Sequence, residues 1–130
     1  MKDLNTIEKG KIGEAYTVKY LRKKRYKILE KNMRNSYGEI DIIASNKEYI
    51  VFVEVKSRST ENEIRPSYAV DLKKQKRIMA AAHGYIKEHS IKKQPRFDVA
   101  EVYLDNIKSK PYKINYIENA YIQGGSYAVF

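Results

Sequence analysis

The sequence contains no cysteine, which excludes disulfide bonds, zinc–thiolate sites and cysteine nucleophiles. It also lacks any apolar run near the roughly 20 residues that span a bilayer. Its N-terminal stretch has no apolar segment of the kind found in signal peptides. No repeat, low-complexity tract or linker rich in proline, glycine or serine interrupts the chain. We therefore expect a single cytoplasmic domain that covers residues 1–130.

Acidic residues are in the minority, because 16 Asp and Glu stand against 26 Lys and Arg and give a formal net charge of +10. An excess of this size on a small domain favours a polyanionic partner. Nucleic acid is the first candidate and an anionic membrane surface the second, since charge alone does not separate them. Hydrophobic residues make up 42% of the chain, which indicates a folded domain rather than a disordered one.

Hydrophobic periodicity and turn signals predict an α/β fold. The predicted elements, in chain order, are a helix at 5–24, strands at 26–34, 39–44 and 50–57, a helix from about Asp71 to Glu88, and strands at 96–104 and 110–121. Asp71 is a good residue for a helix N-cap, and the polar residues 59–66, which include a proline, are expected to form a loop.

The third predicted strand, IVFVEVKS at 50–57, is rich in β-branched residues and apolar on both faces, as in a central buried strand. Side chains alternate across a strand, so Glu54 and Lys56 share one face with Phe52 while three valines line the other. An acid and a base therefore occupy the most hydrophobic segment of the chain. Burying either charge alone would be costly, which marks the pair as a candidate site.

A short polar connection centred near Lys47 and Glu48 predicts an antiparallel hairpin, in which Asp41 lies opposite or nearly opposite Glu54. Two carboxylates that face each other across a strand pair repel, and a divalent cation would relieve the repulsion. Hard oxygen ligands without Cys or clustered His favour Mg²⁺ or Mn²⁺ over zinc. Lys56 would then stabilise negative charge or help to position an attacking water.

Each predicted helix carries one polar residue on an otherwise apolar face. Glu14 shares a stripe with Ile7, Val18 and Leu21, and Gln75 shares one with Ile78, Met79, Ala82 and Ile86. Glu14 is thus a candidate third carboxylate. Carboxylates, a metal and a lysine suit phosphodiester hydrolysis, because the metal polarises the phosphate and lowers the pKa of a bound water.

In the motif GEIDII, Asp41 is separated by twelve residues from the Glu54 of EVK, and this spacing resembles the Asp…Glu-x-Lys signature of PD-(D/E)XK nucleases. The predicted element order resembles their restriction-endonuclease-like αβββαβ core, with a central mixed sheet flanked by helices. A closer resemblance is to the YraN-like family of small bacterial proteins, whose function is poorly defined. It is carried by GKIGEAYTVKYL, NMRNSYGEIDIIA, VFVEVKSR, KQKRIMAAAHGYI, RFDV and INYIENAY, which cover nearly the whole chain.

The chain also resembles archaeal Holliday-junction resolvases, which share a glutamate on the first helix. These resemblances imply a Mg²⁺- or Mn²⁺-dependent endonuclease. They imply catalytic residues at Glu14, Asp41, Glu54, Lys56 and Gln75, of which Asp41, Glu54 and Glu14 would hold metal. The familiar proline before the first Asp is absent, and Ile40 occupies its place, a departure that is common in the superfamily.

Basic and aromatic residues flank the expected site and are candidate contacts for nucleic acid, with solvated surface as the alternative for each. They are Arg34, Tyr37, Arg58, Lys73, Lys74, Lys76 and Arg77. Glu39 could be a second metal ligand or a structural acid. Asp98 is expected to form a structural ion pair with Arg96 or Arg77 rather than to take part in catalysis.

Three functions therefore stay open. The first is a nuclease that hydrolyses DNA phosphodiester bonds, with branched or single-stranded DNA as candidate substrates. The second is a nucleic-acid-binding module without turnover, and the third is an accessory subunit of a DNA repair or processing complex. The intact set of Asp, Glu and Lys favours the nuclease. DNA is a more expected partner than RNA, no membrane partner is expected, and a homodimer is a candidate assembly.

Overall fold

The computed structural model describes residues 5–59, 72–105 and 107–121, which form two helices and a five-stranded sheet. The elements are α1 (Thr6–Lys23), β1 (Lys27–Asn35), β2 (Gly38–Ser45), β3 (Tyr49–Arg58), α2 (Leu72–Glu88), β4 (Gln94–Leu104) and β5 (Pro111–Ile117). The predicted order is confirmed, and the bounds of most elements lie within two residues of the prediction. Asp71 and most of the loop expected at 59–66 lie outside the described residues.

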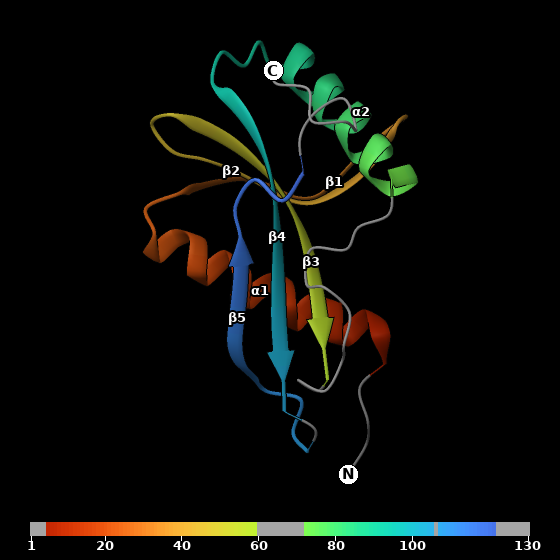
Figure 1. The fold of residues 1–130 in the computed structure, drawn as a ribbon, viewed down its shortest axis with the longest axis vertical. Coiled ribbons are helices and arrows are strands. Elements are labelled where there is room, and N and C mark those ends of the chain that lie inside the picture. The colour runs from red at the N-terminus through yellow and green to blue at the C-terminus, as the bar shows by residue number, and fades with distance from the viewer. Residues whose placement is uncertain (1–4, 60–71, 106, 122–130) are drawn as a thin grey trace.

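The strands lie in the sheet in their sequence order, β1-β2-β3-β4-β5 (Figure 1). Neighbours are antiparallel except for β3 and β4, which are parallel. A parallel pair needs a crossover connection, and α2 lies in the segment between these two strands. The result is an α/β fold with a mixed sheet, consistent with the predicted restriction-endonuclease-like core, to which β5 adds an edge strand.

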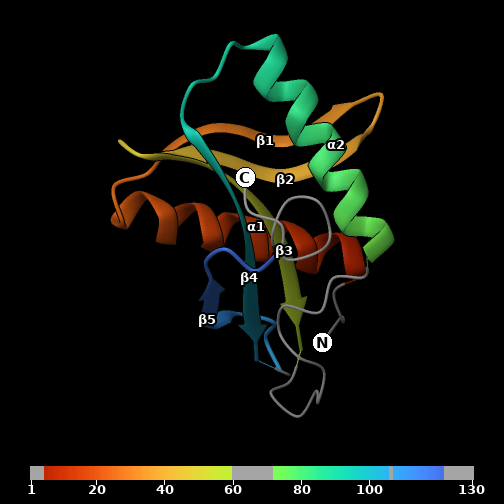
Figure 2. The same ribbon diagram turned by 45° about the horizontal axis from the view of Figure 1, so that its top comes forward.

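The two helices cover opposite faces of the sheet (Figure 2). On the α1 face, Val18 and Leu21 pack with Ile42, Ala44, Val51, Val53 and Ala100. On the α2 face, Ile78, Met79, Ala82 and Tyr85 pack with Ile43, Phe52, Phe97 and Val99. The valines of β3 and its Phe52 thus belong to different clusters, which confirms the predicted alternation. Full burial of one such side chain contributes about 1.5–3 kcal/mol. In the described part of the chain, neither helix is long and apolar enough to cross a membrane.

Helix α1 begins with a capping box, in which the Asn5 side chain accepts from the Glu8 backbone N–H and the Glu8 side chain accepts from that of Asn5. The predicted apolar stripe is right for Val18 and Leu21, but Ile7 is 71% exposed. The Ser57 hydroxyl, near the end of β3, donates to the carbonyl oxygen of Lys9. Ile7 therefore lies past the end of the strand, where the sheet no longer covers the helix.

Gly13 sets how closely α1 approaches β3, because a Cβ at this position would lie 2.1 Å from the Ser57 Oγ and 3.2 Å from the Val55 Cγ1. We expect Gly13→Ala to lower the free energy of unfolding by about 1–3 kcal/mol. Gly10→Ala is the matched control, since nothing lies within 4 Å of its Cβ position. It should stabilise the helix by about 0.5–1 kcal/mol. Denaturant unfolding measures both, and equal effects would contradict the close approach.

Candidate active site

The site begins where the pairing of β2 with β3 stops. The ladder runs from Ser45 opposite Ile50 to Ile42 opposite Val53, so the hairpin is centred where the sequence predicted. One step further, the same register would set Asp41 opposite Glu54. Instead of continuing the backbone ladder, the Asp41 Oδ2 accepts a hydrogen bond of 2.8 Å from the backbone N–H of Val55. A carboxylate thus takes the place of a backbone acceptor between the two strands.

Asp41 lies in an environment that resists its ionisation. Burial and the neighbouring negative charge of Glu54 raise the pKa of Asp41 to about 8. A side-chain hydrogen bond with Glu54 and the more distant charge of Glu14 act in the same direction, while the N–H of Val55 opposes them. The two carboxyl groups therefore lie within hydrogen-bonding reach of each other. A divalent cation would stabilise the ionised forms of both carboxyl groups and relieve the repulsion between them.

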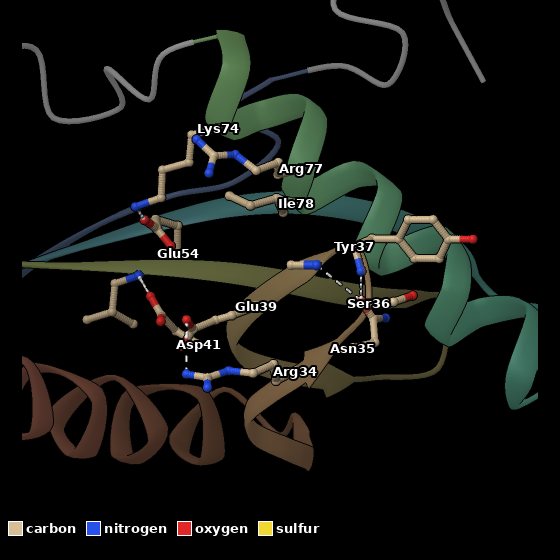
Figure 3. A pocket seen from close by; sticks show the side chains of 12 residues that line it. Arg34, Asn35, Ser36, Tyr37, Glu39, Asp41, Glu54, Lys74, Arg77 and Ile78 are labelled. Atoms are coloured by element: carbon tan, nitrogen blue, oxygen red, sulfur yellow. Dashed lines mark hydrogen bonds and ion pairs between the residues drawn. The ribbon is translucent and has the colours of Figure 1, made fainter.

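Glu54 has a cationic partner from the opposite side of the cavity. The Nζ of Lys74, in the first turn of α2, forms an ion pair with the Glu54 Oε2 (Figure 3). The Glu54 side chain is only 8% exposed, whereas that of Lys74 is 49% exposed. The buried partner is therefore fixed by its strand, and the long lysine reaches toward it from the surface.

Asp41 and Glu54 open into a cavity of about 800 Å³ between the β1–β2 hairpin and α2 (Figure 3). Its lining residues are Arg34, Asn35, Ser36, Tyr37, Gly38, Glu39, Asp41, Glu54, Val55, Lys74, Arg77 and Ile78. One part of the cavity thus holds the half-buried Asp41 and the buried Glu54, and the rest carries three basic side chains and an aromatic ring. Arg34 also forms an exposed ion pair of 3.2 Å with Glu39. Glu39 therefore serves as a surface ion-pair partner.

Asn35 holds the hairpin wall of the cavity in place, a role that the sequence analysis missed. Its Oδ1 accepts from the backbone N–H groups of Tyr37 and Gly38, and its Nδ2 donates to the Ala81 carbonyl oxygen of α2 at 3.0 Å. The tip of the hairpin is thereby tied to the helix, with the Tyr37 side chain 59% exposed at the rim. The signal in the sequence was Asn-Ser-Tyr-Gly, a composition typical of a turn with its own side-chain bond.

Six of the predicted site residues line the cavity together: Arg34, Tyr37, Asp41, Glu54, Lys74 and Arg77. Other predicted catalytic residues do not line it. The charge of Glu14 raises the pKa of Asp41, although Glu14 does not line the cavity. Lys56 on β3 and Gln75 on α2 are half-buried, and each follows closely on a residue of the cavity wall. Lys73 and Lys76 are exposed on α2. The roles proposed for these five residues stay predictions.

Arg58 does not lie at the surface expected of a nucleic-acid contact. Its Nε donates to a carboxylate oxygen of Glu101 on β4, and both side chains are more than nine-tenths buried. The Tyr103 hydroxyl donates to the other oxygen of Glu101. Since this guanidinium neutralises a buried carboxylate, the structure assigns Arg58 to the core. The sequence could not show this, because the pairing depends on the register between β3 and β4.

The chemistry of the acidic pair suits a hard divalent cation. Within residues 5–59, 72–105 and 107–121, no group of three or more His, Cys, Asp and Glu side chains is placed to hold a metal ion. The predicted third ligand, Glu14, therefore does not complete such a group. Mg²⁺ is commonly held by one or two carboxylates and takes its other ligands from water and substrate oxygens. Asp41 and Glu54 fit that pattern.

Comparison with known proteins places the chain in a family. The profile of the uncharacterised protein family UPF0102 matches residues 13–102. A UPF0102 protein of Caldanaerobacter subterraneus subsp. tengcongensis is 49% identical over 122 residues, which cover 93% of this chain and all of the relative. One from Clostridioides difficile is 47% identical over 119 residues, covering 91% of this chain and all of the relative. The resemblance to the YraN-like family is thereby confirmed, and the chain belongs to the uncharacterised protein family UPF0102.

Proposed function

We propose that this protein is a nuclease that requires Mg²⁺ or Mn²⁺ and hydrolyses phosphodiester bonds in branched or single-stranded DNA. The observation that carries the proposal is the Asp41 carboxyl group, set in the break between β2 and β3 beside Glu54. This carboxyl group interrupts a central strand pair and resists ionisation, and both effects lower the stability of the fold. Groups that are unfavourable for stability in this way are often found at functional sites. The resemblance of the motif to PD-(D/E)XK nucleases supports the same chemistry.

Asp41 and Glu54 would hold the cation, which when bound would activate a water and neutralise charge on the phosphate. The β-strands fix both carboxylates, so little reorganisation is needed when the substrate arrives. Lys56 follows Glu54 on the same strand face and would place an ammonium group near the reacting phosphate. Glu14 would add to the negative potential at Asp41, since its charge raises the pKa of that carboxyl group.

The rest of the cavity supports a nucleic-acid substrate. Arg34, Lys74 and Arg77 supply positive charge along its walls and would bind the phosphate backbone. Tyr37 exposes its ring at the rim, where an unpaired base could stack. A volume of about 800 Å³ is large enough for a nucleotide-sized ligand. An unpaired strand could enter this cavity, which supports single-stranded or branched substrates over continuous duplex.

The test is incubation with duplex, single-stranded, flap and junction DNAs, each with Mg²⁺, with Mn²⁺ and with chelator. We expect cleavage with either metal, none with chelator, and a preference for substrates that contain unpaired strands. A matched RNA strand gives the comparison between nucleic acids. Failure to cut any substrate under all metal conditions would overturn the proposal.

A second candidate is a nucleic-acid-binding module without turnover. It is favoured by the ion pair of Lys74 with Glu54, which neutralises one of the two proposed metal ligands. Such a module would bind DNA with steep salt dependence and no requirement for divalent metal. Binding that is equally tight in chelator and in Mg²⁺, together with no cleavage, would support this function over the nuclease.

A further inference from the structure

Lys74 occupies an unusual position for a surface lysine, since its ammonium group contacts a carboxylate proposed to hold metal. We propose that Lys74 is an exchangeable counter-ion, which neutralises Glu54 until a divalent cation binds and then contacts a phosphate of the nucleic acid. The proposal rests on the proposed function of the same site. It adds that metal binding and phosphate binding are coupled through this one side chain.

The geometry allows Lys74 to leave Glu54 while the carboxylate stays in place. Glu54 lies on β3, which is paired along its length with β4, and its side chain is buried. The Lys74 side chain is about half exposed at the beginning of α2. Lysine carries a point charge on a flexible four-carbon stem, so its ammonium group can move without any change in the helix.

The charges favour an exchange over simultaneous binding. One ammonium group offsets the single charge of Glu54, and the neighbouring Asp41 is a second carboxyl group that a metal could use. A divalent cation would neutralise both, and the ammonium group beside it would then be repelled. Lys74 lines the same cavity as Arg34 and Arg77, where a bound phosphate would provide the next negative charge. Lys74 would thereby oppose metal binding in the absence of nucleic acid and favour it in its presence.

Thermodynamic linkage makes this coupling measurable from either side, because the factor by which DNA tightens metal binding equals the factor by which metal tightens DNA binding. The probes are Mn²⁺ and a short single-stranded phosphorothioate oligonucleotide, whose linkages resist hydrolysis. Calorimetric titration of Mn²⁺, with and without the oligonucleotide, compares wild type with Lys74→Gln and Lys74→Met. Lys87→Gln is the matched control, since Lys87 is an exposed lysine in the last turn of the same helix and does not line the cavity.

Without oligonucleotide, we expect both Lys74 variants to bind Mn²⁺ about two- to tenfold more tightly than wild type and Lys87→Gln, because the competing cation is gone. The oligonucleotide should tighten Mn²⁺ binding to wild type and to Lys87→Gln, and it should tighten Mn²⁺ binding to the Lys74 variants less. Thermal melting verifies that all four proteins are folded. Mn²⁺ affinity in the Lys74 variants that equals or falls below that of Lys87→Gln would overturn the proposal.

The result separates this inference from the nuclease assignment. Tighter Mn²⁺ binding by the Lys74 variants, in a protein that cuts no DNA, would support the exchange and reject the nuclease. Metal-dependent cleavage, together with equal Mn²⁺ affinities in wild type and the Lys74 variants, would support the nuclease and reject the exchange. If wild type bound no Mn²⁺ with or without the oligonucleotide, both proposals would fall.

Discussion

Replacing Asp41 by Asn is expected to abolish metal-dependent DNA cleavage and, in the same protein, to stabilise the metal-free fold. The two effects have one cause. The Asp41 carboxyl group is held in a half-buried position beside Glu54, which suits a cation and is unfavourable without one. Functional groups that are strained in the resting protein often show this opposition between activity and stability.

The loss of activity follows from removing one of the two carboxylates proposed to hold the metal. Asparagine keeps the shape of the side chain and can still accept from the Val55 N–H, but it brings no negative charge. We expect cleavage to fall on the order of 10²–10³-fold or more, as when a group that stabilises developing charge is lost. The initial rate on the best DNA substrate, in Mg²⁺ and in Mn²⁺, gives the measurement.

The gain in stability depends on pH, and its direction follows from the raised pKa. The ordinary pKa of an aspartate is 3.8, while that of Asp41 in the folded chain is about 8. Between these values the unfolded chain releases a proton that the folded chain keeps, so stability is lost as pH rises through this range. Asparagine resembles the protonated acid and avoids the loss. At pH 8.5 we expect Asp41→Asn to exceed wild type by about 2 kcal/mol, or roughly 6–10 °C in melting temperature.

At pH 4 the difference between the two proteins should be small, because Asp41 is then protonated in both the folded chain and much of the unfolded chain. Added Mn²⁺ should raise the melting temperature of wild type and not that of the variant. Glu39→Gln is the control, since Glu39 lies on the same strand and lines the same cavity but is exposed and paired with Arg34. This substitution should change neither the cleavage rate nor the pH dependence of stability by much. An Asp41→Asn protein that retains cleavage would contradict the assigned site.

The sheet and its central hairpin were predictable because they follow from local patterns. The β-branched run of β3 and the short polar connection before it fixed both the strand and its register with β2. Asp41 and Glu54 were thus placed together from spacing alone. The exposed position of Ile7 was not predictable, because helical periodicity gives the direction of a side chain and not where the underlying sheet ends.

The cationic side of the site was harder to predict, since it depends on packing between distant segments. Lys74 is one of several basic residues in the KKQKR sequence of α2, and nothing local distinguishes it. Its ion pair with Glu54 arises from where the crossover helix lies over the sheet. The core pairing of Arg58 with Glu101 likewise depends on the parallel register of β3 and β4. Sequence patterns therefore located the carboxylates and left their partners undetermined.

Asp98 illustrates the structural use of a buried acid in the same fold. The expected ion pair with Arg96 is confirmed, with hydrogen bonds of 2.9, 3.3 and 2.8 Å from the guanidinium to the carboxylate. The carboxylate also accepts from the Tyr116 hydroxyl at 2.6 Å and from the Asn119 backbone N–H at 2.9 Å. Burial and the charge of Asp98 raise the pKa of Tyr116, so its hydroxyl keeps the proton that it donates. Every described bond to Asp98 thus comes from β4 or from β5 and the residues that follow it.

The Arg96 guanidinium is held on its other sides by aromatic rings. It donates to the Tyr26 hydroxyl at 2.7 Å and lies 4.9 Å from the ring centroid of Tyr49. Its side chain is 9% exposed, and that of Asp98 is fully buried. A charge pair in such a place contributes little net stability as a whole, because desolvation offsets the attraction, but removal of one member leaves the other charge buried and unpaired.

We therefore expect Asp98→Ala to lower the free energy of unfolding by about 3–5 kcal/mol, as found when one member of a buried pair is removed. Glu118→Gln is the control from the edge of the same network. Glu118 lies 3.8 Å from Arg96 and is 64% exposed, so its loss should cost less than about 1 kcal/mol. Denaturant unfolding compares the two variants. Equal losses of stability in the two variants would contradict the conclusion that Asp98 is the main counter-charge of Arg96.

The double variant Arg96→Met with Asp98→Ala shows whether the stability lost in Asp98→Ala comes from an unpaired buried charge or from lost packing. If the cost of Asp98→Ala comes from leaving the Arg96 guanidinium uncompensated, removing that group as well should recover part of the stability. If the cost comes instead from the cavity left by the aspartate, the second substitution should add to it. We expect recovery, because the Asp98 carboxylate provides the closest negative charge to Arg96 among the described ion pairs.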